Sequence, residues 1–308
     1  MILTLTLNPA LDALVFVEHL QWHAKNIVRQ KNLFPSGKGF NVAKGLSALG
    51  LQTAAVGFVG RADISLYEQT LSARGIRLAL TPIAATRTNL KLIEQDTGLE
   101  TEINEPGAEV SPFELDALSQ SLRSLLQESE WLILSGSVAP GIAPGIYRDF
   151  IREAAAAGVN TLLDTSGEPL RDGISAAPTI LRINRAELDA ATGIETDSFE
   201  EMAAAASSLL AQGIVMMVVS LGPEGALLVH KSGGWLAQPP RLTVVNAVGA
   251  GDIMSAGIVE AWQRGLEPPS LLRCATALAS ASVLTLESGD VDRRVARELE
   301  PQVAIRSL

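Results

Sequence analysis

Short apolar runs alternate with amphipathic patterns along the 308-residue chain. Runs of apolar and β-branched residues predict buried strands at 2–7, 53–60, 131–137 and 216–222. Between the first two of these runs, residues 39–50 carry apolar side chains at helical spacing and end in a glycine. Helices that connect successive strands make those strands parallel and cover the sheet on both faces. The pattern therefore predicts an α/β protein with a mostly parallel central sheet.

The C-terminal part of the chain continues this alternation. Two apolar runs separated by Lys-Ser-Gly-Gly, at 226–230 and 234–240, predict a hairpin, and 242–248 reads as a further strand. Apolar helices are predicted over 252–265 and 270–285. Further predicted elements are strands within 160–167 and 178–184 and helices within 65–75, 145–158 and 198–213.

Two stretches depart from the pattern. Residues 11–34 and 86–104 show strand-like alternation rich in polar side chains, with no helix between the strands. We interpret them as a small β lid over one end of a single domain that spans residues 1–308.

Composition excludes several classes of partner. The net charge is −10 and the isoelectric point is near 4.9, which argues against nucleic acid or an anionic membrane as the main partner. Cys274 is the only cysteine, so no internal disulfide forms and a reducing compartment is expected. The N-terminus lacks the basic segment of a signal peptide, and no apolar run reaches the length of about 18 residues that a membrane span needs. We expect a cytoplasmic protein.

Two glycine-containing segments lie at the predicted starts of helices. Gly249, Ala250, Gly251 and Asp252 follow the run at 242–248, and a helix N-terminus with nearby glycines suits a phosphate group. Asp252 as a simple helix cap explains the same residues. Earlier, Lys38 stands between two glycines at another helix start and is either part of an anion or polyol site or an exposed turn lysine.

Other candidate positions also have two interpretations. Arg87, Asn89 and Lys91 alternate onto one strand face, which either clamps a phosphate or faces solvent. Asn184 and Glu187 have the spacing to hold hydrated Mg²⁺, and equally the spacing of a capping box.

Two enzyme classes lack their residue patterns. The three histidines share no metal-ligand spacing, which excludes a metallohydrolase, and the Ser-Gly-Ser at 135–137 lacks the nucleophile elbow of serine hydrolases.

The order of these motifs along the chain resembles the PfkB (ribokinase-like) carbohydrate kinases. The motifs are TLNPALD, SGKGFNVAKGLSALG, TRTN, SGS, an Asn-x-x-Glu, SLGPEGA and VGAGD, and they extend over nearly the whole sequence. The first three look most like the hexose-phosphate branch, which contains 1-phosphofructokinase, tagatose-6-phosphate kinase and a 6-phosphofructokinase. The resemblance implies a three-layer αβα sandwich with a β lid, and ATP-dependent phosphorylation of a ketohexose phosphate with Mg²⁺ as cofactor.

The resemblance also implies a role for individual residues. Asp252 matches the catalytic base, and the amides of Gly249, Ala250 and Gly251 match the anion hole. Lys25 matches a cation that some relatives supply across a dimer interface formed by the lids. The positions implied for the sugar phosphate are Asp12, Gly37, Lys38, Asn41, Arg87 and Ser137. Those implied for the nucleotide and its metal are Arg182, Asn184, Ser220, Gly222, Gly225 and, for Mg²⁺ through water, Glu187.

Some positions differ from the usual family pattern. Arg182 stands where a lysine is common, Ala247 where a threonine is common, and Ile253 where a small polar residue is common. The segment 286–290 also differs from the usual one, so a monovalent cation is possible but not implied. D-fructose 1-phosphate is the expected substrate, with tagatose 6-phosphate and fructose 6-phosphate as alternatives. A kinase of an unphosphorylated sugar and a non-catalytic sugar-phosphate or nucleotide sensor on the same fold remain as further hypotheses.

Overall fold

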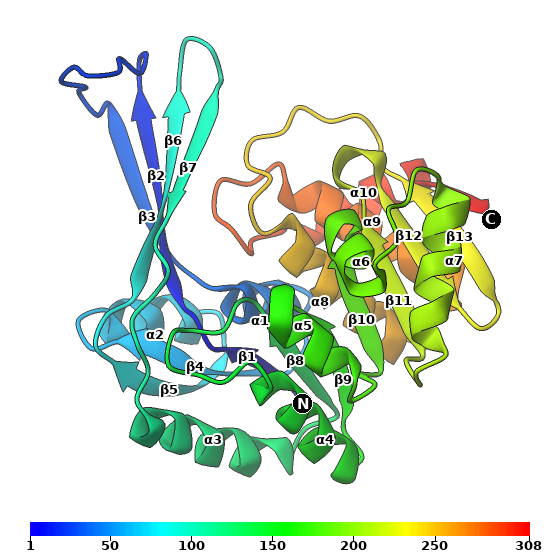
Figure 1. The fold of residues 1–308 in the computed structure, drawn as a ribbon. Helices are drawn as coiled ribbons and strands as arrows, with labels where there is room; N and C mark the ends of the chain where they lie inside the picture. Colours follow the sequence, from blue (N-terminus) through cyan, green and yellow to red (C-terminus); the bar gives the residue numbers. More distant parts are fainter.

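A ten-stranded sheet forms the centre of the computed structural model, which describes residues 1–308 (Figure 1). The strands from β11 to β5 run parallel to their neighbours, whereas β12, β13 and β14 add an antiparallel edge. Across the sheet the order is β14 (Ala304–Ser307), β13 (Gly233–Gln238), β12 (Ala226–His230), β11 (Met216–Ser220), β10 (Ile180–Asn184), β9 (Asn160–Asp164), β8 (Trp131–Ser135), β1 (Ile2–Thr6), β4 (Thr53–Gly60) and β5 (Arg77–Ile83).

Helices cover both faces of this sheet because both faces are apolar. In β8, Leu132 and Leu134 enter one core and Trp131 and Ile133 enter the other, as expected for side chains that alternate along a strand. The first core is covered by α3 (Pro112–Leu126), α4 (Ile146–Ala156), α5 (Gly167–Ile174), α6 (Arg185–Thr192) and α7 (Phe199–Leu210). The opposite face is covered by α1 (Lys38–Ala48), α2 (Ile64–Ser72), α8 (Ala250–Gln263), α9 (Pro268–Ser282) and α10 (Arg293–Leu299). The predicted three-layer αβα architecture is confirmed.

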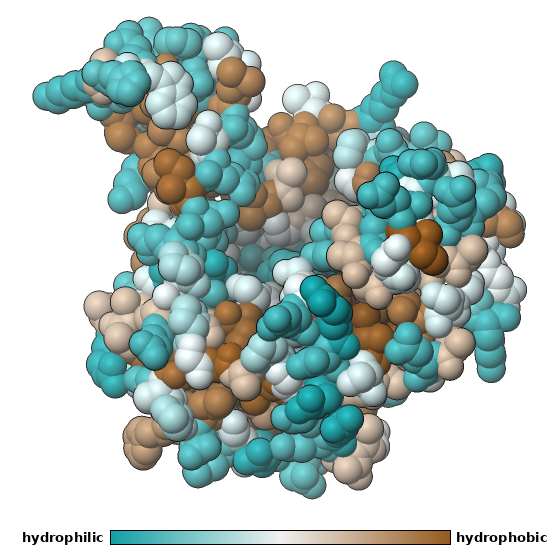
Figure 2. Space-filling view, in the orientation of Figure 1, coloured by the Kyte–Doolittle hydropathy of each residue, from teal (hydrophilic) through white to brown (hydrophobic).

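A separate four-stranded sheet forms the lid, which projects away from the central sheet (Figure 1). Its strands, in order, are β3 (Gln30–Ser36), β2 (Ala10–Val17), β6 (Arg87–Glu94) and β7 (Glu100–Asn104). They come from the two stretches that depart from the alternating pattern, so the expected β lid is confirmed. The surface is hollowed between the lid and the C-terminal half of the chain (Figure 2).

The strand predicted at 242–248 is wrong, because this segment forms a loop before α8. Pro239 and Pro240 follow β13 and cannot donate to a sheet ladder, and the far edge of β13 is already paired with β14. Val244 and Val245 consequently remain 55% and 48% exposed. β-branched residues favour a strand only where a strand edge can receive them.

Several elements were not anticipated from the pattern. They are β5, α3, α5, α10, β14 and two 3₁₀ turns, η1 (Gly222–Glu224) and η2 (Glu300–Gln302). The start of α3 carries a capping box in which Ser111 and Glu114 exchange hydrogen bonds, a signal that was available in the sequence. None of the helices combines the length and the apolarity needed to cross a bilayer.

Candidate active site

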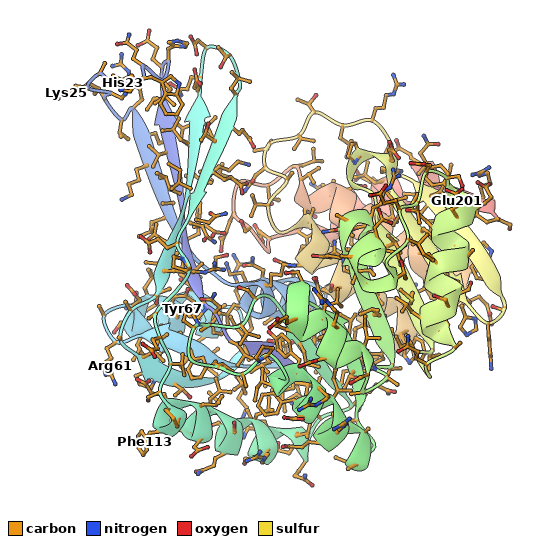
Figure 3. All side chains as sticks on the ribbon, viewed as in Figure 1. His23, Lys25, Arg61, Tyr67, Phe113 and Glu201 are labelled. Carbon is orange, nitrogen blue, oxygen red and sulfur yellow. The ribbon has the colours of Figure 1, made fainter.

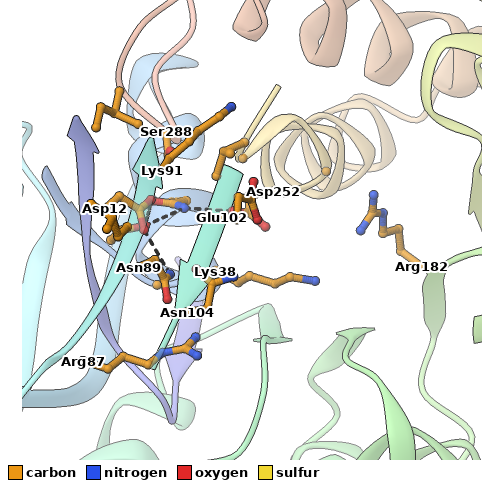
Figure 4. A pocket seen from close by; sticks show the side chains of 18 residues that line it. Asp12, Lys38, Arg87, Asn89, Lys91, Glu102, Asn104, Arg182, Asp252 and Ser288 are labelled. Carbon is orange, nitrogen blue, oxygen red and sulfur yellow. Dashed lines mark hydrogen bonds between the residues drawn. The ribbon is translucent and has the colours of Figure 1, made fainter. Parts of the chain in front are cut away.

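A cavity of about 350 Å³ lies between the lid and the carboxyl ends of the central strands (Figure 4). In open parallel sheets this edge is where ligands bind. The lid contributes Asp12, Leu14, Arg87, Asn89, Leu90, Lys91, Glu102 and Asn104 to the lining. Ser36, the last residue of the lid strand β3, also lines the cavity, and the body contributes Gly37, Lys38, Asn41, Arg182, Val248, Gly249, Gly251, Asp252 and Ser288. Although the protein is acidic overall, four cationic side chains converge on this cavity.

The first turn of α8 brings Asp252 and the two glycines into the cavity. Gly249 precedes the helix with φ of 85°, a left-handed conformation that favours glycine. Gly251 has a different reason to be glycine, because a Cβ there would collide with the guanidinium of Arg182. The backbone N–H groups of Gly249 and Gly251 have no acceptor within the chain, whereas that of Ala250 makes a 3.3 Å bond to the carbonyl of Ala247. The helix N-terminus therefore offers free donors to an anion.

The Asp252 carboxylate is only 4% exposed, and Nδ2 of Asn41 donates to its Oδ2 at 2.9 Å. Burial raises the pKa of Asp252 to about 7, a rise that Lys38 opposes and the nearby Asp164 supports. A carboxylate with a pKa near neutrality is suited to accepting a proton from a hydroxyl group.

Two cations from different elements meet on one buried acid beside Asp252. Nζ of Lys38, at the start of α1, donates to Oδ1 of Asp164 at 2.8 Å. Nη1 of Arg182, on β10, donates to Oδ2 of the same carboxylate at 3.0 Å. Attraction to Asp164 raises the pKa of Lys38, so its ammonium group is positively charged at neutral pH.

The lid strand β6 turns a polar face toward the cavity, as its alternation predicted. Arg87, Asn89 and Lys91 all line it, and Nδ2 of Asn89 donates to Oδ1 of Asp12 on the neighbouring strand at 3.1 Å. The Lys91 ammonium is buried and contacts Asn246 Oδ1 at 3.2 Å and Glu100 Oε2 at 2.6 Å. The lid therefore adds two cations to those of the body.

The residues expected to bind nucleotide lie at the carboxyl ends of β10 and β11, beside the cavity. Arg182 connects the two regions, because its Nη2 donates to Oγ of Ser220 at 3.0 Å. The turn η1 follows β11, with Gly222 at its start and Gly225 after it.

The predicted metal motif forms a capping box at the start of α6. Asn184 and Glu187 exchange hydrogen bonds of 2.9 and 2.8 Å. The capping interpretation of this pair is therefore realised. It occupies Oε2 of Glu187 and leaves Oε1 at the exposed start of α6.

Two predicted substrate residues do not line the cavity of their own chain. Ser137 accepts a hydrogen bond of 3.1 Å from Asn8 and follows Gly136, which packs against the Lys38 side chain. Lys25 is exposed at the tip of the lid, far from the central sheet (Figure 3).

The structure also explains two departures from the family pattern. Ile253 is fully buried and packs against Gly45 of α1, so its side chain points into the core rather than into the cavity. Ala247 lies exposed in the loop before α8.

Sequence reasoning missed Asp164, which joins two of the candidate cations. The only available signal was an acidic residue directly at the end of an apolar strand.

The comparisons with known proteins cover nearly the whole chain. Residues 8–292 match the family described as pfkB family carbohydrate kinase. The 1-phosphofructokinase of Vibrio cholerae is 36% identical over 308 residues, which cover 100% of this chain and 97% of that protein. The 1-phosphofructokinase of Xanthomonas campestris is 38% identical over 296 residues, covering 94% and 92%.

Solved structures agree with these matches. Phosphofructokinase-2 from Escherichia coli in complex with substrates and products is 26% identical with a TM-score of 0.89, and 98% of each chain is covered. The same enzyme in complex with potassium is 25% identical with a TM-score of 0.88 and the same coverage.

Proposed function

The chain belongs to the pfkB family of carbohydrate kinases, and we propose that it phosphorylates D-fructose 1-phosphate with ATP to give fructose 1,6-bisphosphate. The observation that carries the proposal is the buried Asp252 at a helix N-terminus, flanked by Lys38 and Arg182 and facing two lid cations in one cavity. A base, an anion site and a cationic substrate site thus share about 350 Å³.

Asp252 acts as the base for the acceptor hydroxyl. Its carboxylate takes the hydroxyl proton while the oxygen forms a bond to the γ-phosphorus and the bond to the β-phosphate oxygen breaks. The free amides of Gly249 and Gly251 and the positive end of α8 stabilise the charge on the transferring group. Lys38 and Arg182 lie beside this position and offset further negative charge. The protein forms no covalent bond to the substrate in this step, and most of the rate enhancement comes from aligning the hydroxyl with the γ-phosphate.

In this proposal ATP binds at the carboxyl ends of β10 and β11, near Arg182, Ser220 and the turn between Gly222 and Gly225. Mg²⁺ fits near Glu187, because the capping box leaves one of its carboxylate oxygens free to accept a hydrogen bond from metal-bound water. When bound, Mg²⁺ neutralises charge on the phosphates of ATP.

A phosphorylated sugar explains the cations of the lid better than a neutral sugar does. Arg87 and Lys91 face the cavity from β6, and burial lowers the pKa of Arg87 while Asp12 opposes that shift. A buried cation is costly unless a charged ligand or partner compensates it. Glu100 compensates Lys91 within the chain, whereas Arg87 has no carboxylate partner and its buried Nε has no hydrogen-bond partner. The relatives named 1-phosphofructokinase support fructose 1-phosphate over tagatose 6-phosphate or fructose 6-phosphate.

A substrate panel tests the proposal. ADP release from Mg·ATP is followed with fructose 1-phosphate, fructose 6-phosphate, tagatose 6-phosphate, fructose and ribose, and the product is identified by ³¹P NMR. We expect the highest kcat/KM for fructose 1-phosphate and a 1,6-bisphosphate product. A higher kcat/KM for another hexose phosphate would reassign the substrate. Binding of ATP without turnover of any sugar would support a sensor instead.

We also propose that two copies of the chain associate through their lids. The lid carries large apolar side chains that face solvent, among them Trp22 at 76% and Leu99 at 61% exposure. Lys25 lies at the lid tip, so a role in substrate binding requires the site of a second copy (Figure 3). Single exposed apolar residues are common, but several on one small sheet indicate an interaction surface.

A further inference from the structure

Asp164 is a fully buried acid, at the carboxyl end of β9, that contacts no solvent and no substrate-facing space. We propose that Asp164 is a positioning residue for phosphoryl transfer, which holds the ammonium of Lys38 and the guanidinium of Arg182 side by side next to Asp252. This inference rests on the proposed kinase function and adds a residue to it.

The carboxylate divides its two oxygens between the two cations. Oδ1 accepts from Lys38 Nζ at 2.8 Å, and Oδ2 accepts from Arg182 Nη1 at 3.0 Å. Its backbone is fixed as well, because β9 pairs with β8 in parallel register and the N–H of Gly136 donates to the Asp164 carbonyl at 2.8 Å. The acid is thus held on the rigid central sheet, which is the part of a scaffold that positions groups most accurately.

Without this acid, the two cations would repel each other. Lys38 comes from α1 and Arg182 from β10, and both bind the same carboxylate. The charge of Arg182 disfavours the charged form of Lys38, because like charges repel strongly where water is excluded. Burial alone would raise the pKa of Asp164, but Lys38 and Arg182 outweigh it and lower that pKa. The acid therefore stays ionised and remains a fixed negative charge between the two positive ones.

The bridge leaves both cations available to a ligand. The side chain of Lys38 is 42% exposed and that of Arg182 is 10% exposed, and both line the cavity. The Arg182 guanidinium lies against Gly251, and its buried Nε has no hydrogen-bond partner in the chain. Both cations are therefore held where the anion site at the start of α8 begins.

Asp164 also acts on the proposed base through charge. Three charged groups face Asp252: Lys38 from α1, Arg182 from β10 and Asp164 from β9. Asp164 raises the pKa of Asp252, whereas the two cations lower it. Removal of the Asp164 charge should therefore shift the acidic limb of the pH profile toward lower pH.

Asp164→Asn keeps the shape of the side chain and removes its charge. With the best sugar phosphate of the panel and saturating Mg·ATP, we expect kcat to fall roughly 100-fold with less than about a threefold change in the sugar KM. We also expect the acidic limb of kcat/KM against pH to move to lower pH. Glu260→Gln is the matched control, because Glu260 is another buried acid that pairs with Arg264 and Arg293 away from the cavity, and it should change neither quantity.

Asp164→Glu separates position from charge and serves if the Asn variant does not fold. It keeps the charge but moves the carboxylate by one methylene, so kcat should fall more than about tenfold with an unchanged acidic limb. A kcat within about threefold of wild type in the folded variants overturns the inference. So does recovery of activity at raised Mg²⁺, because Asp164 would then act through the metal. Absence of turnover by the wild-type protein overturns both the proposed function and this inference. A wild-type rate in the Asp164 variants overturns only this inference, so the two failures can be told apart.

Discussion

At the scale of single residues, the state of Asp252 makes the stability of the protein depend on pH. Its pKa in the folded protein is about 7, well above its unfolded value, so the folded protein binds an extra proton between about pH 4 and pH 7. The free energy of unfolding contributed by this group therefore falls as pH rises through that window. Asp252→Asn removes the titration, and we expect it to stabilise the protein at pH 8 by roughly 1–3 kcal/mol and at pH 5 by less than half as much.

Urea unfolding of both proteins at pH 5 and pH 8 checks this prediction. Destabilisation by the Asn variant at pH 8 would show that the ionised Asp252 is well solvated or well paired, and the assignment of a raised pKa would be wrong.

At the scale of elements, the lid strand β6 supplies the charge that recognises the substrate phosphate. Lys91 lies on its cavity face and is buried, while Lys31 on β3 of the same sheet is exposed and does not line the cavity. Lys91→Met should raise the KM for the sugar phosphate by roughly 10- to 100-fold, because a charge-assisted contact worth about 1.5–3 kcal/mol is lost. The KM for ATP should change little. Steady-state kinetics with Lys31→Met as the control test this, and equal effects of the two substitutions would contradict a specific role of β6.

At the scale of the whole molecule, the lid is expected to serve a second copy as well as its own cavity. Trp22 is 76% exposed on the lid, and Phe113 is 82% exposed at the start of α3, on the other side of the body (Figure 3). We expect sedimentation velocity to show a dimer for the wild-type protein and for Phe113→Asp, and a monomer for Trp22→Asp. A dimer that survives Trp22→Asp and a second lid substitution, Leu99→Asp, would exclude the lid as the interface.

Most of the fold could be predicted from the sequence because both faces of the central strands are buried. The run at 53–60 coincides with β4, since only a strand covered on both sides is continuously apolar. The same reasoning failed at 242–248, where β-branched residues lie in an exposed loop with no strand edge beside them.

Site residues could be predicted where their residue types fit few other roles. They could not be predicted where the same spacing is typical of both a ligand site and a helix cap. Gly249, Gly251 and Asp252 combine conformational demands with a buried acid, and the structure brings all three together at the cavity. Asn184 and Glu187 could not be resolved, because a capping box and a metal motif have the same three-residue spacing. Asp164 was missed because its two partners are 126 and 18 residues away along the chain.

The proposed function depends on Asp252 acting as the base of an ATP-dependent sugar-phosphate kinase. The most direct test compares kcat for fructose 1-phosphate between the wild-type protein and Asp252→Asn, with ATP and sugar-phosphate affinities measured by calorimetry. We predict a loss of at least about 10³-fold in kcat with affinities within a few fold of wild type. An Asn variant that retains more than about a tenth of the wild-type kcat would show that Asp252 is not the catalytic base.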